Sequence, residues 1–170
     1  VAIILMKSVG ISRTIARRLP IPRWGRPAVG GLAIGIMALW IPEVFGIGYG
    51  VTESALLLHL SLWALIAIGI AKVAATAICL GFGFGGGIFS PALVIGAMVG
   101  GAFGLIATGA FPDYSSGAGA YTIVGMGAVA AAVLGAPIST TLIIFEMTNN
   151  YALTLGVMVA VVIASEISHH

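Results

Sequence analysis

The chain has 170 residues, of which 60% are hydrophobic and only 7% are charged, and its net charge is +2. A soluble domain carries about 25% charged residues, so the composition excludes a soluble globular domain and indicates an integral, multi-pass membrane protein. At about 20 residues per span, the length allows roughly six to eight apolar segments, some of them shorter than the bilayer is thick.

The positive charge is concentrated near the start of the chain. The basic residues there are Lys7, Arg13, Arg17, Arg18, Arg23 and Arg26, and only Lys72 follows them. A basic run of this kind can indicate nucleic-acid binding. Between apolar segments, however, the positive-inside rule explains it better, because cytoplasmic loops carry an excess of Lys and Arg. We therefore expect a cytoplasmic loop here, with Trp24 as a headgroup anchor, and no nucleic-acid partner.

Prolines and glycines divide the first third of the chain into short helices. Residues 1–19 are predicted to form a helix that ends at Pro20, because proline cannot continue a helix. A second helix is predicted over residues 27–40 and ends before Pro42. A glycine-punctuated break then follows over residues 42–50.

A short helix is predicted from residue 52 to about residue 59, and a full membrane span over residues 60–80. The next helix is predicted over residues 90–108. Its small residues Gly96, Gly100 and Gly104 recur every four positions. This is the small-xxx-small pattern of closely packed membrane helices, because small side chains let two backbones approach.

The last part of the chain contains a polar loop and three further helices. The loop covers residues 111–117, and the helices are predicted over residues 120–134, 138–147 and 151–167. The segment 138–147 is too short to cross a bilayer of about 30 Å at 1.5 Å per residue. Short and interrupted apolar helices are typical of transport proteins whose site lies near the midplane of the membrane. The predicted fold is therefore an all-α membrane protein with tilted, short and broken helices.

The most unusual segment is a second, more glycine-rich break at residues 81–91, between two apolar helices. Non-helical backbone at membrane depth is tolerated only where it is buried in protein or lines a cavity. Pro91 suits the first turn of the following helix. The start of a helix attracts anions through its unpaired N–H groups and its dipole. We therefore predict an anion site at the main-chain N–H groups of Ile88 and Phe89; the alternative is a tight helix corner whose glycines serve packing alone.

Two side chains in the span before this break need an explanation. Lys72 is an ionisable residue inside a membrane segment, where such residues are costly and need partners. We expect it to donate hydrogen bonds to carbonyl groups that the nearby breaks leave free. Cys79 is the only cysteine, so no disulfide forms within the chain, and we expect it to be a small side chain of the core.

Motifs of catalysis and of metal binding are missing from the sequence. There is no HExxH sequence, no Ser/His/Asp arrangement, no Cys/His cluster and no phosphate-binding P-loop. The glycines of 81–87 include the spacing of a dinucleotide fingerprint, but neither a preceding soluble strand nor an acidic ribose ligand accompanies them. We therefore expect a protein that is not an enzyme and that binds no metal and no organic cofactor.

The string GGIFSPAL at residues 86–93 resembles the GxFxPxL motif of the CLC family of voltage-gated chloride channels and proton/chloride exchangers. Other segments resemble further landmarks of this family, in the same order and at similar spacing. These segments are residues 26–32, 42–49, 72–80, 125–128, 136–139 and 145–148. The resemblance therefore covers almost the whole chain.

This resemblance implies a fold and a site. Residues 1–170 would be a partial CLC-type transmembrane domain: the second of two inverted repeats, without the first repeat and without the final helix. The family's central chloride site uses backbone amides at the positions matching Ile88 and Phe89. The motif residues that would support this site are Gly83, Gly85, Gly86, Gly87, Ser90 and Pro91. The family's gating glutamate and its internal proton-carrying glutamate match no residue here, so the sequence does not distinguish a channel from an exchanger.

The resemblance also implies partners. Chloride would be the transported ligand, with protons as the second ion in the exchangers. The subunit would form a homodimer through the helices near 138–148 and 151–167, in the plasma (inner) membrane. Two alternatives stay open: a non-conducting membrane scaffold, and a different broken-helix secondary transporter with a carboxylate substrate.

Overall fold

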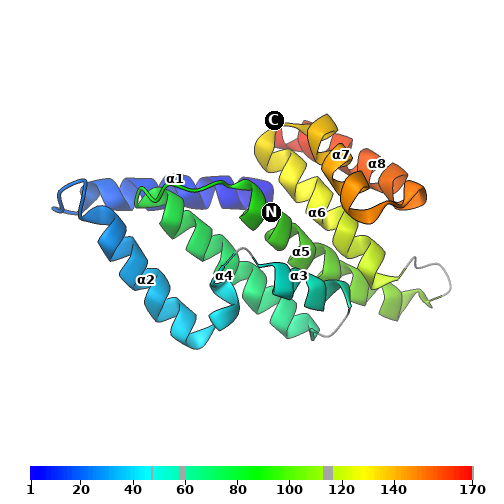
Figure 1. Cartoon of the computed structure of the whole chain (residues 1–170), viewed down its shortest axis with the longest axis horizontal. Helices are drawn as coiled ribbons and strands as arrows, with labels where there is room; N and C mark the ends of the chain where they lie inside the picture. The colour runs from blue at the N-terminus through cyan, green and yellow to red at the C-terminus, as the bar shows by residue number, and fades with distance from the viewer. Residues whose placement is uncertain (47, 58–59, 113–116, 170) are drawn as a thin grey trace.

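The computed structural model describes residues 1–46, 48–57, 60–112 and 117–169, and this part of the chain contains helices and no strands. The elements are α1 (Ala2–Arg18), α2 (Arg26–Trp40), the 3-10 turn η1 (Pro42–Val44), α3 (Tyr49–Leu56), α4 (Leu62–Gly81), α5 (Phe89–Ala110), α6 (Ala118–Leu134), α7 (Pro137–Thr148) and α8 (Tyr151–His169). Helices α1 and α2 lie at one end of the molecule, and α7 and α8 at the other (Figure 1). The predicted all-α fold with short helices is confirmed.

Most helix ends lie where the local sequence predicts them. Helix α1 ends at Arg18, and the next residue, Leu19, is already extended with ψ 134° as the chain enters Pro20. Between α7 and α8, Asn149 adopts a left-handed conformation with φ 46°. The side chain of Asn150 then accepts a hydrogen bond from the N–H of Leu153 at 3.2 Å. Both asparagines thus perform the turn and capping functions for which their side chains are suited.

Helix α3 differs from the prediction. It begins at Tyr49 and not at residue 52, because Gly48 turns the chain at φ 88° directly before it. A Cβ atom at Gly48 would lie 2.7 Å from Cγ2 of Val94 in α5, so the close approach of α5 also requires glycine here. The predicted end of this helix at His59, like the loop residues 113–116, lies outside the described residues.

Helices α5 and α6 pack with their backbones in close contact. A Cβ atom added at Gly96 would collide with the carbonyl oxygen of Gly125, and one at Gly100 would meet the carbonyl oxygen of Tyr121. At Gly104, a Cβ atom would lie 2.9 Å from Cα of Ala118. The predicted small-residue face is therefore confirmed as a surface where two backbones touch. This contact fixes the position of α5, and with it the start of that helix.

A continuous core connects the two ends of the molecule. Its largest fully buried side chains include Leu65 in α4, Met98 in α5, Ile144 in α7 and Val161 in α8. These belong to one cluster of packed residues. Helix α4 therefore packs beside α5, and α8 is held on the side of α6 and α7.

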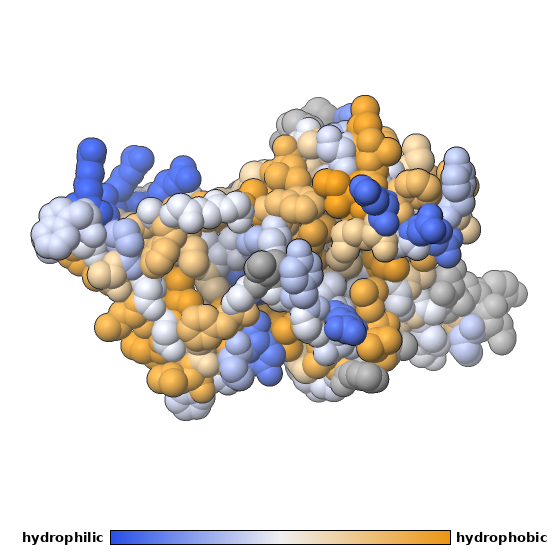
Figure 2. Space-filling model, in the orientation of Figure 1, coloured by the Kyte–Doolittle hydropathy of each residue, from blue (hydrophilic) through white to orange (hydrophobic). Residues whose placement is uncertain are grey.

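The outer surface is apolar over a large area (Figure 2). Helices α4 and α5 and the segment Tyr151–Ser168 of α8 are long and apolar enough to cross a membrane. Large side chains such as Leu39 at 83% and Ile138 at 77% exposure face outward. In water such a surface would aggregate, whereas lipid covers it without cost. The chain is an integral membrane protein.

Candidate functional site

The predicted break between α4 and α5 is present. At the end of α4, the N–H of Phe82 donates to the carbonyl of Ile78 at 2.9 Å, and the N–H of Phe84 to that of Cys79 at 3.0 Å. Gly83 then turns the chain at φ 91°, a conformation that suits glycine. Residues 84–87 are neither helical nor extended in a sheet. A stretch of irregular backbone therefore separates two membrane-spanning helices.

The start of α5 presents unpaired donors. Phe89 is the first residue of the helix, and Ile88 caps it with φ −85° and ψ −13° and without a side-chain hydrogen bond. The first helical bond runs from the N–H of Ala92 to the carbonyl of Ile88 at 3.1 Å. No group in the described part of the chain accepts from the N–H of Ile88 or Phe89. These are orphan donors of the kind found at helix starts, where they bind anions.

A cavity of about 510 Å³ lies beside this helix start and joins the two breaks of the chain. The second break contributes Val44 and Gly46, and the central break contributes Gly85–Gly87. Helices α2, α4 and α5 complete the wall. Segments about forty residues apart in sequence therefore form one hollow, which we call the break cavity.

Lys72 projects from α4 into the wall of the break cavity. Its side chain is buried, and its Nζ donates to the carbonyl oxygens of Val44 at 2.8 Å and of Gly46 at 2.9 Å. Val44 is the last residue of η1 and Gly46 lies in the non-helical segment after it, so the expected partnership with freed carbonyls is confirmed. The lysine places a cation in the wall of the break cavity.

The motif residues divide into two groups around the start of α5. Gly85, Gly86, Gly87, Ser90 and Pro91 line the break cavity. The side chains of Ile88 and Phe89 instead pack against the small cluster that contains Leu5, Ala92 and Ile95.

Side-chain packing therefore anchors Ile88 and Phe89, while the neighbouring glycines leave the backbone uncovered. A Cβ atom at Gly85, Gly86 or Gly87 would meet nothing within 4 Å. Within this chain these glycines therefore lie on an open surface beside the break cavity. Gly83 is exposed and does not line the cavity.

Sequence reasoning missed two features of this site. It treated the breaks at 42–50 and 81–91 separately, although both are glycine-rich and Lys72 lies between them as a signal that could have connected them. It also expected Cys79 in the core, and this was wrong. Cys79 is only partly buried and lines the break cavity, because α4 turns this position toward the hollow between the breaks.

The chemistry of the break cavity is that of neutral main-chain donors and one cation. Among the described residues, no group of three or more His, Cys, Asp or Glu side chains could hold a metal ion. The four acidic residues in the described ranges, Glu43, Glu53, Glu146 and Glu166, do not line the cavity. A site with donors and a positive charge is suited to bind an anion.

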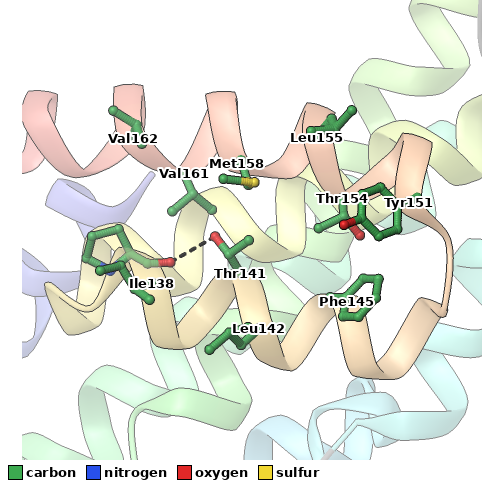
Figure 3. A pocket seen from close by; sticks show the side chains of 11 residues that line it. Ile138, Thr141, Leu142, Phe145, Tyr151, Thr154, Leu155, Met158, Val161 and Val162 are labelled. Atoms are coloured by element: carbon green, nitrogen blue, oxygen red, sulfur yellow. Dashed lines mark hydrogen bonds between the residues drawn. The ribbon is translucent and has the colours of Figure 1, made fainter.

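A second hollow lies between α7 and α8 and has a volume of about 460 Å³. Its walls are mostly apolar and include Ile138, Leu142 and Phe145 from α7 and Leu155 and Met158 from α8 (Figure 3). The two threonine hydroxyls in the wall are satisfied internally. The hydroxyl of Thr141, for example, donates to the carbonyl of Pro137 at 2.9 Å.

The fold and the break cavity define a class: an integral membrane protein of short, broken helices with a helix start at an internal break. The family model described as "Voltage gated chloride channel" matches residues 1–169. The chain belongs to this family.

Curated relatives and a solved structure agree with this assignment. The H(+)/Cl(-) exchange transporter ClcA of Cronobacter sakazakii is 40% identical over 132 residues. Those of Citrobacter koseri and Salmonella agona are 41% identical over 132 residues, and each match covers 78% of this chain and 28% of the relative. The crystal structure of a slow cyanobacterial Cl-/H+ antiporter has a TM-score of 0.86 at 28% identity, covering 97% of this chain and 39% of that one. The chain thus spans less than a third of the length of these curated relatives.

Proposed function

We propose that the chain forms part of a chloride-transporting membrane protein and that the main-chain N–H groups of Ile88 and Phe89 bind the ion. The observation that carries this proposal is the start of α5, where two donors without an acceptor lie at an internal break beside a cavity with a buried lysine. The names of the relatives supply the identity of the anion. The protein acts in transport and not as an enzyme.

Main-chain donors suit conduction because they are neutral. A binding site in a transport pathway must attract the ion and also release it. Helix-start N–H groups attract an anion by their partial charges, without forming an ion pair that would hold it. Lys72 adds a modest attraction, since its charge is shared with the two carbonyls that it bonds.

Residues 1–170 are, in this proposal, the second of two inverted repeats in a longer subunit, with the first repeat and the final helix supplied by the rest of the protein. The partial coverage of the relatives supports this. The exposure of Gly83–Gly87 also supports it, because bare backbone at membrane depth needs protein or a cavity around it. The plasma (inner) membrane is the proposed location.

Proton-coupled exchange is the form of transport that the relatives favour, since both the ClcA proteins and the solved antiporter carry it in their names. The family is described as a voltage-gated chloride channel, so a channel is the alternative to an exchanger. Liposomes containing the full-length protein separate these possibilities. A chloride gradient should drive proton movement in an exchanger and only chloride current in a channel, and no flux at all would support a scaffold.

The second partner is another copy of the subunit. We propose that α7 and α8 form the contact surface of a homodimer. Only 17% of the membrane window of α8 is buried within the chain, against 44% for α4 and 56% for α5. The hollow between α7 and α8 would receive side chains of the second copy, as in an isologous interface.

The anion site is tested by removing one amide donor. Ile88→Pro in the full-length protein deletes an N–H, and the observed φ of −85° lies close to the angle that proline adopts. Chloride binding, measured by calorimetry, should become undetectable. Ile88→Ala is the matched control, because it truncates the same side chain and keeps the amide. Unchanged chloride affinity in Ile88→Pro would overturn the proposed site.

A further inference from the structure

The end of α1 and the start of α2 form a strongly basic corner. We define the basic corner as Arg13, Arg17, Arg18, Arg23 and Arg26. Hydrophilic side chains project from this end of the molecule (Figure 2). All of these arginines except the partly buried Arg26 are exposed. The first acidic residue of the chain is Glu43, so no carboxylate lies nearby in the sequence to neutralise them.

Arg26 differs from the other four arginines, because part of its guanidinium group is buried within the chain. Its Nε is buried, and no group in the described ranges accepts a hydrogen bond from it. A guanidinium offers five N–H donors in a planar fork that matches phosphate oxygens. The four exposed arginines have guanidinium groups whose geometry suits phosphate groups.

An open groove along α1 leads away from this corner. Lys7 and Arg18 lie at its two ends, and Ile11 and Ile15, at 61% and 52% exposure, lie between them. The hydroxyl of Thr14 is satisfied by the carbonyl of Gly10 at 3.0 Å, so the groove demands no polar ligand along its length. The groove is formed by one face of α1 alone and has a cation at each end, so its apolar middle, at Ile11 and Ile15, is the part that suits a hydrocarbon tail.

The location of the basic corner favours a membrane lipid over other anionic partners. Trp24, at 85% exposure, lies in the connection between α1 and α2, and tryptophan is enriched at the level of lipid headgroups. Clusters of four to eight Lys and Arg residues next to membrane helices attract anionic lipids. A nucleic acid would find the same charge but would have no use for an apolar groove.

We propose that the basic corner binds the headgroup of an anionic phospholipid of the phosphatidylglycerol type, with an acyl chain along the groove of α1. Arg13, Arg17 and Arg18 bind the phosphate by paired hydrogen bonds. The lipid would fix the cytoplasmic end of α1, which crosses α4 where Ser12 packs against Gly81, directly before the central break.

The test uses the purified full-length protein in detergent, titrated with dioleoyl-phosphatidylglycerol or dioleoyl-phosphatidylcholine and followed by native mass spectrometry. The wild type should bind phosphatidylglycerol preferentially. The triple variant Arg13→Gln/Arg17→Gln/Arg18→Gln should lose about tenfold or more of this preference, since each basic residue near the surface contributes substantially to lipid attraction. The matched triple Arg→Lys variant keeps the charge and loses the fork, and it should retain part of the preference.

Two controls decide between a local site and a general effect of charge. Glu166→Gln, near the C-terminal end of α8, raises the net charge away from the basic corner and should leave lipid preference unchanged. Inorganic phosphate at equal concentration should not displace the lipid. Equal binding of the two lipids by the wild type, full retention in the triple Gln variant with an unchanged unfolding temperature, or displacement by phosphate would each overturn the proposal.

Discussion

The ammonium group of Lys72 holds the end of η1 and the irregular segment after it against α4. Its two hydrogen bonds, of 2.8 Å to Val44 and 2.9 Å to Gly46, are charge-assisted. Both acceptors belong to backbone that has no helical partner. The lysine therefore replaces the hydrogen bonds that a continuous helix would have made, and it does so inside the wall of the break cavity.

Lys72→Met should destabilise the full-length protein by about 2 kcal/mol, because it leaves two carbonyls without a donor. The methionine fills a similar volume, so lost packing contributes little. The midpoint of thermal unfolding in detergent measures the change. Faster proteolysis between residues 41 and 49 should accompany it, because this segment loses its tie to α4.

Lys72→Arg is the control for this prediction, since it preserves the charge and offers donors to the same carbonyls. It should lie closer to the wild type than the methionine variant does. If Lys72→Met unfolds at the wild-type temperature and resists protease equally, the two hydrogen bonds do not stabilise the segment.

Lys72 also illustrates what could be predicted from sequence. A lysine in an apolar span between two glycine-rich breaks has few partners other than freed carbonyls, so its role followed from local chemistry. The position of Cys79 in the wall of the break cavity could not be predicted from local chemistry. It depends on how α2 and the segment at 44–46 pack beside α4. Residues 44–46 and 85–87 line one cavity through tertiary packing alone, and no local pattern contains that information. The amide site at Ile88 and Phe89 stays a prediction.

Helices α5 and α6 are held together by direct contact of their backbones. Gly100→Ala should therefore destabilise the protein by roughly 1–3 kcal/mol, the cost of overpacking a closely packed interface. The added Cβ would meet the carbonyl oxygen of Tyr121 and Cα of Gly125, the latter at 3.0 Å. Neither is a flexible side chain that could move aside. A lower midpoint of thermal unfolding is the expected result.

Gly109 provides a matched control in the same helix, because a Cβ atom there would meet nothing within 4 Å. Gly109→Ala should be neutral or slightly stabilising, since alanine favours the helix over glycine. Equal effects of the two substitutions would mean that helix propensity, and not close packing, governs α5.

The helix bounds show why the elements could be predicted well from sequence. Proline, glycine and asparagine act through their own backbone preferences, so the ends at Arg18, Gly81 and Thr148 needed no tertiary information. The start of α3 at Tyr49 was missed because it depends on Gly48, whose conformation is fixed together with its contact to Val94 in α5. Local signals thus place an element, and packing adjusts its boundary by a few residues.

Three kinds of exposed surface lie at different places on the molecule. The break cavity is open, the basic corner lies at one end, and α7 and α8 expose apolar side chains at the other (Figures 1 and 2). A chain that spans 39% of a solved antiporter subunit leaves surfaces for the rest of that subunit as well as for a second copy. Separating these two kinds of surface requires a variant that affects one of them alone.

Ile138→Trp supplies such a variant. The side chain of Ile138 is 77% exposed at the hollow between α7 and α8. In an isologous dimer each substitution acts twice, so overpacking should weaken association more than about tenfold. Single-molecule photobleaching of the labelled full-length protein in bilayers measures the monomer fraction at low density.

Leu39→Trp on α2 is the matched control, because Leu39 is similarly exposed at 83% but lies at the opposite end of the molecule. It should leave the monomer fraction unchanged. The unfolding temperature of both variants separates weaker association from misfolding. A dimer as stable in Ile138→Trp as in the wild type would place the contact on another face. The apolar surface of α7 and α8 would then face lipid, where it needs no partner.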